Sequence, residues 1–339
     1  MDIAIIPLDP TDDTAVEQAY QIVAASDAAD LPDFPPHCRT RFVGWLRHPM
    51  PGNLTHFALA RIDGVPAGYL GIDLPQLDNT DNAEMNLHVH PRHRRKGVGR
   101  ALHDYAVRLL REHGRKWVTS ATVATLPGGP QRPEAPAAFA TATGAKAALV
   151  DVRRRLDVTT VDQAELDRLL AAAWPRADGY SLVRWIGDTP DEDLDDLGYL
   201  DGRLLEDAPM GDLAWGPVQV DAARMRGIEE ALNLRGRRRY HCAMRHDATG
   251  RIIAWTVLDF GATSPWHAYQ QITIVDPRHR GHRLGTIIKI ENLRYALASE
   301  PGLRAVDTWN AAVNDHMISI NEAIGFRPVD SWTNWQLAL

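Results

Sequence analysis

A basic stretch containing two glycines, at residues 90–100, is the part of this sequence best suited to chemistry. It reads His-Pro-Arg-His-Arg-Arg-Lys-Gly-Val-Gly-Arg, between an alternating strand pattern at 84–89 and helical spacing at 101–110. A strand-to-helix turn leaves several backbone N–H groups unpaired at the positive end of the helix dipole. Gly97 and Gly99 carry no side chain that would block a ligand, and basic side chains surround them. The stretch therefore predicts a phosphate or pyrophosphate site.

A closely similar stretch occurs at residues 276–285, Asp-Pro-Arg-His-Arg-Gly-His-Arg-Leu-Gly, again between a strand pattern and a helical pattern. The tetrad Pro-Arg-His-Arg stands at 91–94 and at 277–280. A repeat period this long indicates a duplicated domain rather than a solenoid. We expect two copies of one anion-binding fold, at 1–157 and 180–339, joined by a helical linker at 158–179.

The order of predicted elements is the same in both copies: strand, helix, helix, hairpin, strand, glycine turn, helix, strand, helix, strand. In the first copy a hairpin joins 54–62 to 65–73 across Asp63-Gly64. We expect the first helix to run from Asp12 to about Ala25, with Thr11 as its N-cap. The order predicts an α/β fold, a mixed and mostly antiparallel sheet with helices on both faces.

Composition excludes several classes of protein. Hydrophobic content of 45% and charged content of 24% are typical of a soluble globular chain. A net charge of −7 argues against a nucleic-acid binder, and no apolar run reaches the length of a membrane span. Cys38 and Cys242 have no metal-ligand spacing, and no Gly-Lys-Ser/Thr follows the glycines as in a P-loop NTPase. We expect a cytoplasmic enzyme, monomeric or homodimeric, without metal, nucleic-acid or membrane partners.

The segment 188–212 is strongly acidic, with Arg203 as its only basic residue. One interpretation is a solvated pair of helices. The other is that some carboxylates line the mouth of a site for a cationic substrate, which Trp215, Trp255 and Trp266 would also suit. Core packing is the alternative role for these tryptophans.

With this element order, the chain resembles the GNAT superfamily, the Gcn5-related N-acetyltransferases. Its signature, Arg or Gln-x-x-Gly-x-Gly or Ala, stands here as Arg94-x-x-Gly97-x-Gly99. In the second copy it is 280–285, where Arg283 departs from the expected glycine. That copy also has an Asn segment and a helix ending in Gly-Phe, similar to the family's later motif. The layout is similar to two-domain acetyltransferases of the mycothiol synthase type, in which the C-terminal half is the working one.

The resemblance implies acetyl-CoA as cofactor, lying across strands that splay at the glycine turn. The turn would bind its pyrophosphate, and the strand before the turn would pair with its pantetheine arm. The residues implied in the first copy are Leu87, Val89, Arg94, Arg95, Lys96, Gly97, Val98, Gly99 and Arg100. Those implied in the second copy are Ile274, Val275, Arg280, Gly281, His282, Arg283, Leu284, Gly285, Thr286, Asn310 and Asn314.

The implied reaction is direct attack of an amine on the thioester through a tetrahedral intermediate, with a backbone N–H near Val89 or Val275 stabilising the oxyanion. A base must keep the amine neutral, and an acid must protonate the thiolate. Glu84 or His88, on one strand face, could be the base; the alternative is that this face is simply solvated. The family's usual tyrosine acid falls at Asn321 in the second copy and at Ala140 in the first. Neither residue can donate a proton as tyrosine does.

We therefore expect an N-acetyltransferase that moves an acetyl group from acetyl-CoA to a primary amine of a small molecule, with a cationic amine as one option. Two alternatives remain open from the sequence. One is a non-catalytic GNAT-like module for CoA binding or assembly, and the other is acetylation of a peptide or protein amine.

Overall fold

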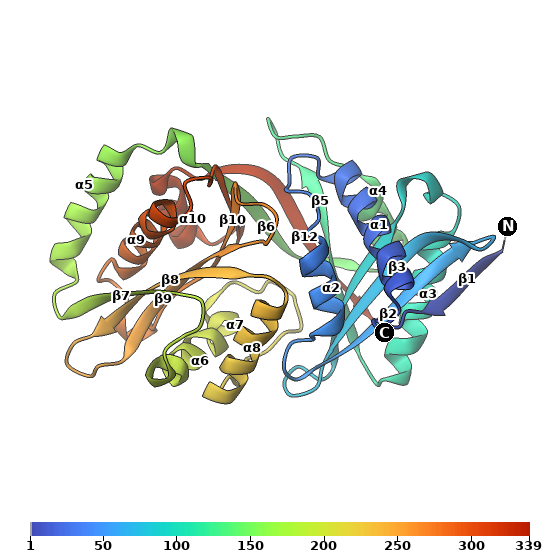
Figure 1. Cartoon of the computed structure of the whole chain (residues 1–339), viewed down its shortest axis with the longest axis horizontal. Helices are drawn as coiled ribbons and strands as arrows, with labels where there is room; N and C mark the ends of the chain where they lie inside the picture. The colour runs from blue at the N-terminus through green and yellow to red at the C-terminus, as the bar shows by residue number, and fades with distance from the viewer. Residues whose placement is uncertain (1) are drawn as a thin grey trace. The chain divides into compact units, whose positions relative to one another are not determined.

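The structure is a computed structural model that describes residues 2–339. The chain divides into two compact units (Figure 1). Unit 1 consists of the chain up to Val150 together with Met210–Gly216 and Ser331–Leu339. Unit 2 consists of Asp151–Pro209 and Pro217–Asp330. The units are composed of other segments than the predicted domains 1–157 and 180–339 with their linker at 158–179, and these domain bounds stay a prediction.

Unit 1 is an α/β unit built on a sheet with the strand order β1-β2-β3-β4-β5. All its pairings are antiparallel except β4 with β5, which is parallel. Its elements are β1 (Ile3–Pro7), α1 (Asp13–Asp30), α2 (Arg39–Arg47), β2 (Asn53–Ile62), β3 (Val65–Pro75), β4 (Asn82–Val89), α3 (Val98–Glu112), β5 (Trp117–Thr125), α4 (Ala135–Ala142) and the start of β6 (Lys146–Asp157). The predicted mixed, mostly antiparallel sheet is confirmed here.

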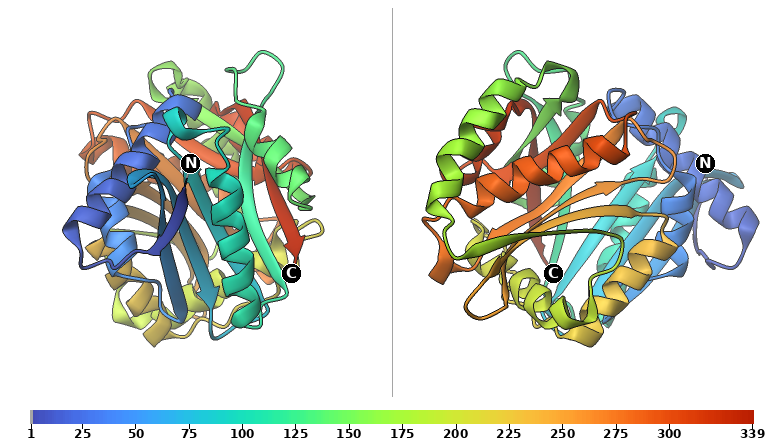
Figure 2. Two further views of the ribbon diagram at one scale, coloured as in Figure 1. Left: turned by 90° about the vertical axis from the view of Figure 1, so that its right-hand side faces the viewer. Right: turned by 60° about the vertical axis from the view of Figure 1, so that its left-hand side comes forward.

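Alternation along β2 shows which helix covers which face of this sheet. Phe57 and Leu59 pack with α1 and α2, whereas Ala58 and Ala60 pack with α3. Successive strand residues point to opposite faces, so α1 and α2 cover one face and α3 the other, as the left view of Figure 2 shows. The face of β4 that carries Glu84 and His88 is therefore the α1 face, since His88 lies opposite Tyr69 of the α1 core.

Two local predictions in unit 1 have different outcomes. The hairpin turn at Asp63-Gly64 is confirmed, with φ of 47° and 84°, as the mirror-image hairpin turns require. The N-cap prediction is wrong by one residue. Asp12, not Thr11, caps α1 by accepting from the amides of Thr14 and Ala15, while Thr11 donates to Asp9. Helix α1 also continues to Asp30, because no helix breaker precedes Pro32.

Unit 2 repeats the plan with the strand order β7-β8-β9-β10-β11-β6, in which only β10 and β11 are parallel. Its elements are α5 (Gln163–Ala173), β7 (Tyr180–Ile186), α6 (Leu194–Gly202), α7 (Leu204–Asp207), α8 (Ala222–Leu234), β8 (Arg238–His246), β9 (Ile252–Phe260), β10 (His267–Val275), α9 (Leu284–Ser299), β11 (Ala305–Ala311), α10 (Asp315–Ile324) and the start of β12 (Arg327–Ala338). Helices α5 and α9 share one core, and α6 and α8 share the other. The right view of Figure 2 shows α9 in orange against these strands.

Each unit contains a strand segment from the far half of the sequence. In unit 1, the end of β12 lies beside β5: Trp335 Nε1 donates to Thr122 Oγ1 at 2.8 Å, and the Leu339 amide donates to the Lys116 carbonyl at 2.9 Å. In unit 2, residues 151–157 of β6 pair antiparallel with β11. The last strands of the two predicted copies are thus exchanged between the compact units.

A buried ion network holds β6 in unit 2. The Arg153 side chain is fully buried and donates to Asp330 at 2.9 and 2.7 Å and to Asp307 at 3.1 Å. Arg155 and His267 also donate to Asp307. Burial alone would raise the pKa of Asp307, but these hydrogen bonds and charges hold it far below its ordinary value.

We expect Arg153→Met to lower the free energy of unfolding of unit 2 by about 3–5 kcal/mol, because it removes the buried guanidinium that donates to both Asp330 and Asp307. Urea unfolding followed by circular dichroism measures the change. Arg155→Met is the matched control, since the Arg155 side chain is 22% exposed and Asp307 keeps Arg153. Equal losses from the two variants would contradict the assignment.

Candidate functional site

The sheet of each unit opens between its two parallel strands. In unit 1, β4 and β5 pair only at residues 82–84 with 117–119. In unit 2, β10 and β11 pair only at 267–269 with 305–307. Among the described residues, the rest of β4 and of β10 has no partner on that side. We call the place where pairing ends the fork of each unit.

Main-chain groups of β4 point toward the fork of unit 1. The His90 amide donates to the Ala67 carbonyl at 2.9 Å, which fixes the alternation along this antiparallel pair. The amides of Leu87 and Val89 therefore face the fork, and that of His88 faces β3. Consistent with this, the Val89 carbonyl accepts from Arg94 Nε, on the fork side, at 3.2 Å. The contacts of Leu87 and Val89 with the arm of the cofactor stay a prediction.

The corresponding strand of unit 2 differs by a β-bulge. The register of β9 and β10 shifts between Gln270 and Thr273, whereas the β3–β4 register is continuous. The Asp276 amide donates to Ile253, so alternation directs Val275 and Thr273 toward the fork and Ile274 toward β9. The sequence does not predict that Thr273 faces the fork, because a β-bulge has no characteristic residue type.

The turn after β4 presents a row of free amides. None of the amides of residues 95–100 has a hydrogen-bond acceptor within residues 2–339; the next bond of the helix is from Ala101 N to the Gly97 carbonyl. Arg95 and Gly97 adopt φ of 62° and 89°. Consecutive amides in such a turn form a concave nest for an anion at the start of α3.

The turn after β10 has the same backbone with its glycine and arginine exchanged. Gly281 has φ of 89° and Arg283 has φ of 59°, in the places of Arg95 and Gly97. Arg283 therefore preserves the turn, although it departs from the family signature. Non-glycine residues rarely adopt this conformation, and they cluster at functional sites.

Free positive charge is concentrated at the turn of unit 1. Arg92, Arg95, Lys96 and Arg100 are exposed and form no salt bridge within the described part of the chain. Arg94, in contrast, connects the turn to α1, because its guanidinium donates to the Asp30 carboxylate at 2.8 and 2.7 Å. The side chain of Arg94 is thus directed at α1 rather than at the turn.

In unit 2 the basic residues around the turn are mostly occupied. Arg278 pairs with Asp276 at 2.8 Å and Arg280 with Asp207 at 2.9 Å. His282 Nδ1 lies 2.9 Å from the Arg176 carbonyl. Arg283 remains exposed beside Leu284, Gly285 and Thr286 at the start of α9.

The second glycine of each turn lies against the strand that ends there. A Cβ on Gly99 would stand 3.6 Å from Val89 Cγ2 and 3.7 Å from the Phe139 ring. A Cβ on Gly285 would stand 3.7 Å from Ile320 Cδ1 and 3.9 Å from Val275 Cγ2. A large side chain at either position would fill the space beside its fork.

Glu84 stands where the pairing of β4 with β5 ends. It lies opposite Asp73 in the β3–β4 register. Desolvation by the surrounding protein and the Asp73 charge raise the pKa of Glu84 to about 7, although its side chain reaches solvent. A carboxylate with this pKa can exchange a proton near neutral pH, which is what a general base needs.

His88 is half-buried on the same face of β4, between Leu87 and Val89. Its Nδ1 lies 3.7 Å from Asp27 Oδ1 of α1. Burial lowers the pKa of His88 below its ordinary value. Both sequence-derived base candidates therefore belong to unit 1 and border its fork.

Comparisons with known proteins agree with this architecture. The family model described as Acetyltransferase (GNAT) family matches residues 18–125. The solved structure of a tandem GNAT protein from the clavulanic acid biosynthesis pathway, determined without AcCoA, is 35% identical, with 99% of this chain and 98% of that chain covered and a TM-score of 0.84. None of the curated proteins compared with this chain matches it. The chain is a tandem GNAT protein.

Two more distant structures share the fold. A GCN5-related N-acetyltransferase from Sphaerobacter thermophilus is 13% identical, with a TM-score of 0.62 and coverage of 99% of this chain and 95% of that chain. A glucosamine N-acetyltransferase region of a fungal multi-domain β-N-acetylglucosaminidase is 15% identical, with a TM-score of 0.66. This chain covers 38% of that longer protein.

The asparagines expected to serve the second copy of the tandem GNAT protein bind one another or a helix end. Asn321 is fully buried and donates to Asn310 Oδ1 at 2.6 Å. Asn314 caps α10 by accepting from the Met317 amide at 3.2 Å. Asn321 is thus placed to orient Asn310, which is half-buried in β11.

The acidic segment of unit 2 is partly exposed, and five of its carboxylates form salt bridges. The pairs are Asp188 with Arg239, Asp191 with Arg226, Asp193 with Arg245, Asp196 with Arg251, and Asp207 with Arg280. These pairs attach α6 and its flanks to the sheet. Of the three tryptophans, Trp255 is a core residue.

Carboxylates on the α6 face of the unit 2 sheet are likewise bound to arginine. Asp259 pairs with Arg237, and Asp307 with Arg153 and Arg155. His241 is stacked between Trp185 and Trp255, and burial lowers its pKa to about 3. The two carboxylates are thus held in ion pairs, and His241 stays unprotonated at neutral pH.

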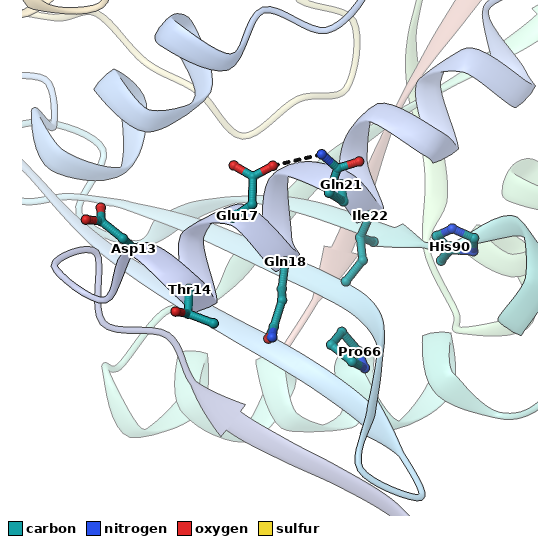
Figure 3. Close-up of a pocket in the computed structure, with 8 residues that line it drawn as sticks. All are labelled: Asp13, Thr14, Glu17, Gln18, Gln21, Ile22, Pro66 and His90. Atoms are coloured by element: carbon teal, nitrogen blue, oxygen red, sulfur yellow. Dashed lines mark hydrogen bonds between the residues drawn. The ribbon is translucent and has the colours of Figure 1, made fainter.

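Unit 1 also has a surface hollow of about 520 Å³ between α1, Pro66 and His90 (Figure 3). Its acidic lining is already paired: Asp13 binds Arg47 and Glu17 binds Arg39. Gln21 donates to Glu17 at 2.8 Å. The hollow therefore offers fewer unpaired polar groups than the fork.

No helix in residues 2–339 is long and apolar enough to cross a membrane. The same residues contain no cluster of His, Cys, Asp and Glu side chains that could hold a metal ion.

We expect Asp73→Asn to lower the pKa of Glu84, because it removes the negative charge opposite the carboxyl group but leaves its surroundings in place. Titration of the Glu84 carboxyl carbon by NMR measures the shift. Asp63→Asn, at the hairpin tip, is the control. An unchanged Glu84 pKa in Asp73→Asn would show that the two carboxylates do not interact.

Proposed function

We propose that this tandem GNAT protein transfers an acetyl group from acetyl-CoA to a primary amine of a small molecule, and that unit 1 carries both sites. The observation that carries the proposal is the row of free amides at residues 95–100, surrounded by unpaired cations beside the fork. Such a turn binds pyrophosphate through its amides, and the exposed arginines and lysine add charge-assisted hydrogen bonds.

The arm of the donor would extend from this turn along the free edge of β4. The amides of Leu87 and Val89 face that edge and would pair with the arm as a neighbouring strand does. Acetyl-CoA supplies the thioester whose carbonyl the amine attacks. A backbone amide at the fork then stabilises the negative charge that develops on the carbonyl oxygen.

Glu84 is the group proposed to receive the first proton. An amine arrives mostly as the ammonium form at neutral pH, and the carboxylates of Glu84 and Asp73 attract it. A Glu84 pKa of about 7 allows that carboxylate to take the proton and leave the amine neutral for attack. The relative at 35% identity comes from the biosynthesis pathway of a small molecule, which supports a small-molecule acceptor.

For unit 2 a non-catalytic role fits better. The resemblance to mycothiol synthase-type enzymes favours the C-terminal half for the chemistry. Yet the carboxylates of unit 2 that face α6 are bound to arginine, and its turn keeps only Arg283 free. We therefore propose unit 2 as a structural or CoA-binding module.

Gly99→Trp should abolish acetyl-CoA binding, because its side chain would fill the space between Val89 and Phe139. Gly285→Trp, the equivalent change in unit 2, should leave the affinity within about threefold. Isothermal titration calorimetry with acetyl-CoA measures both. Loss of binding only in Gly285→Trp would move the donor site to unit 2, and no binding by the intact chain would remove the proposal.

Glu84→Gln should lower kcat by about 100-fold or more and leave the KM for acetyl-CoA unchanged, because it removes the base but not the donor site. The rise of kcat between about pH 6 and 8 should disappear, since the Glu84 carboxyl has a pKa of about 7. Release of CoA thiol with ethylenediamine as acceptor measures the rates. A variant as active as the wild type would exclude Glu84 as the base.

A further inference from the structure

Three titratable side chains meet on the α1 face of unit 1, beside the fork. They are Asp27 of α1, His37 of the loop before α2, and His88 of β4. His37 Nδ1 lies 2.8 Å from Asp27 Oδ2, and His88 Nδ1 lies 3.7 Å from Asp27 Oδ1. Their side chains are 25%, 25% and 31% exposed for His37, His88 and Asp27, so protons can exchange with solvent.

The longer of the two contacts is an ion-pair distance rather than a hydrogen bond. Catalytic hydrogen bonds are often long before the substrate binds and shorten in the complex. The His37 contact is already short, so it fixes the Asp27 carboxylate in front of His88. Asp27 therefore contacts the imidazoles of both His37 and His88, and His88 borders the fork.

The position of His88 in β4 relates this cluster to the donor. His88 stands between Leu87 and Val89, whose amides face the fork. Glu84 lies four residues earlier on the same face, about 13 Å away along the strand. Glu84 is therefore too far from the Leu87 and Val89 amides to exchange protons with a group bound beside them. The imidazole is the titratable group next to the arm-binding amides.

Burial favours the neutral form of His88, because it lowers the pKa of the imidazole. The charges act in both directions: Asp27 and Asp30 raise this pKa, while His37 and Arg94 lower it. Tyr69 of β3 packs on the remaining side, with ring centroids 6.4 Å apart. Arg94 is bound to Asp30 and so leaves Asp27 to the histidines. A neutral imidazole with Nδ1 directed at a carboxylate presents its Nε2 lone pair as a proton acceptor.

On the basis of the proposed acetyl transfer in unit 1, we propose that Asp27 and His88 form a proton-transfer pair that carries the proton of the attacking amine to the sulfur of CoA. His37 is a positioning residue that holds the Asp27 carboxylate. The pair fills the role for which neither copy has the usual tyrosine.

The step balances without any further reagent. The amine nitrogen forms a bond to the thioester carbon, and the carbon–sulfur bond breaks with its electron pair remaining on sulfur. The proton lost by nitrogen moves to His88 Nε2 and then to the thiolate. The products are the amide and CoA thiol, and the proton taken earlier by Glu84 returns to solvent. Nothing is oxidised or reduced.

The test compares the intact chain with His88→Gln, Asp27→Asn and His37→Gln. His113→Gln, at the exposed end of α3, is the matched control. Release of CoA thiol from acetyl-CoA is measured from about pH 5 to 9 with ethylenediamine as acceptor. Calorimetry with acetyl-CoA on every variant separates loss of donor binding from loss of proton transfer.

His88→Gln should lower kcat by about 100-fold or more and abolish the most acidic rise of the pH profile, with acetyl-CoA affinity unchanged. Asp27→Asn should move that rise to lower pH, because the carboxylate raises the pKa of His88. His37→Gln should lower kcat less than His88→Gln does. A merely structural role would reduce kcat without moving the rise.

Equal pH profiles for His88→Gln and His113→Gln would overturn the proton-transfer pair and leave the proposed function intact. An intact chain that fails to bind acetyl-CoA would overturn the proposed function, and the pair with it. So would an intact chain that binds acetyl-CoA but releases CoA no faster than the uncatalysed reaction.

Discussion

The early end of pairing between the parallel strands is the constraint on which the rest of unit 1 depends. Because β4 and β5 pair only at residues 82–84, the main chain of β4 beyond Glu84 keeps hydrogen-bonding groups that the sheet does not use. Arg94 binds one of them, the Val89 carbonyl, and also binds Asp30 of α1. One side chain thus connects the strand end, the turn and the first helix into a fixed corner. Arg280, Val275 and Asp207 make the same corner in unit 2.

The two units share a backbone and differ in where their charges are used. In unit 2, arginines and carboxylates neutralise one another across strands and helices, which stabilises the fold but leaves few groups for a ligand. In unit 1, the cations of the turn face solvent, and Glu84 meets a like charge instead of a partner. A buried ion pair must be satisfied to be tolerated, whereas a ligand site needs groups that become satisfied only on binding. This difference is why we propose the donor and acceptor sites in unit 1 and a structural or CoA-binding role for unit 2.

Local signals in the sequence predicted most of the fold and the donor turn, because spacing and glycine placement act over a few residues. The hairpin at Asp63-Gly64 and the nest at 95–100 are of this kind. The salt bridges of the acidic segment could not be predicted, because its arginine partners lie on other elements far along the chain. Asp27 and His88 are likewise 61 residues apart, and only packing of α1 on the sheet joins them. The strand exchange could not be predicted either, because the residue patterns of β6 and β12 are compatible with both sheets.

Strand exchange has a consequence for biosynthesis. Residues 331–339 belong to unit 1, so the first half of the chain cannot complete its sheet when it leaves the ribosome. Until the last strand has been made, one edge of β5 stays open to pairing with other chains, although domains usually fold from the N-terminus as they emerge. Closing the sheet also requires contacts across nearly the whole sequence, which slows folding. The sheet of unit 1 can therefore be completed only after all of unit 2 has been synthesised.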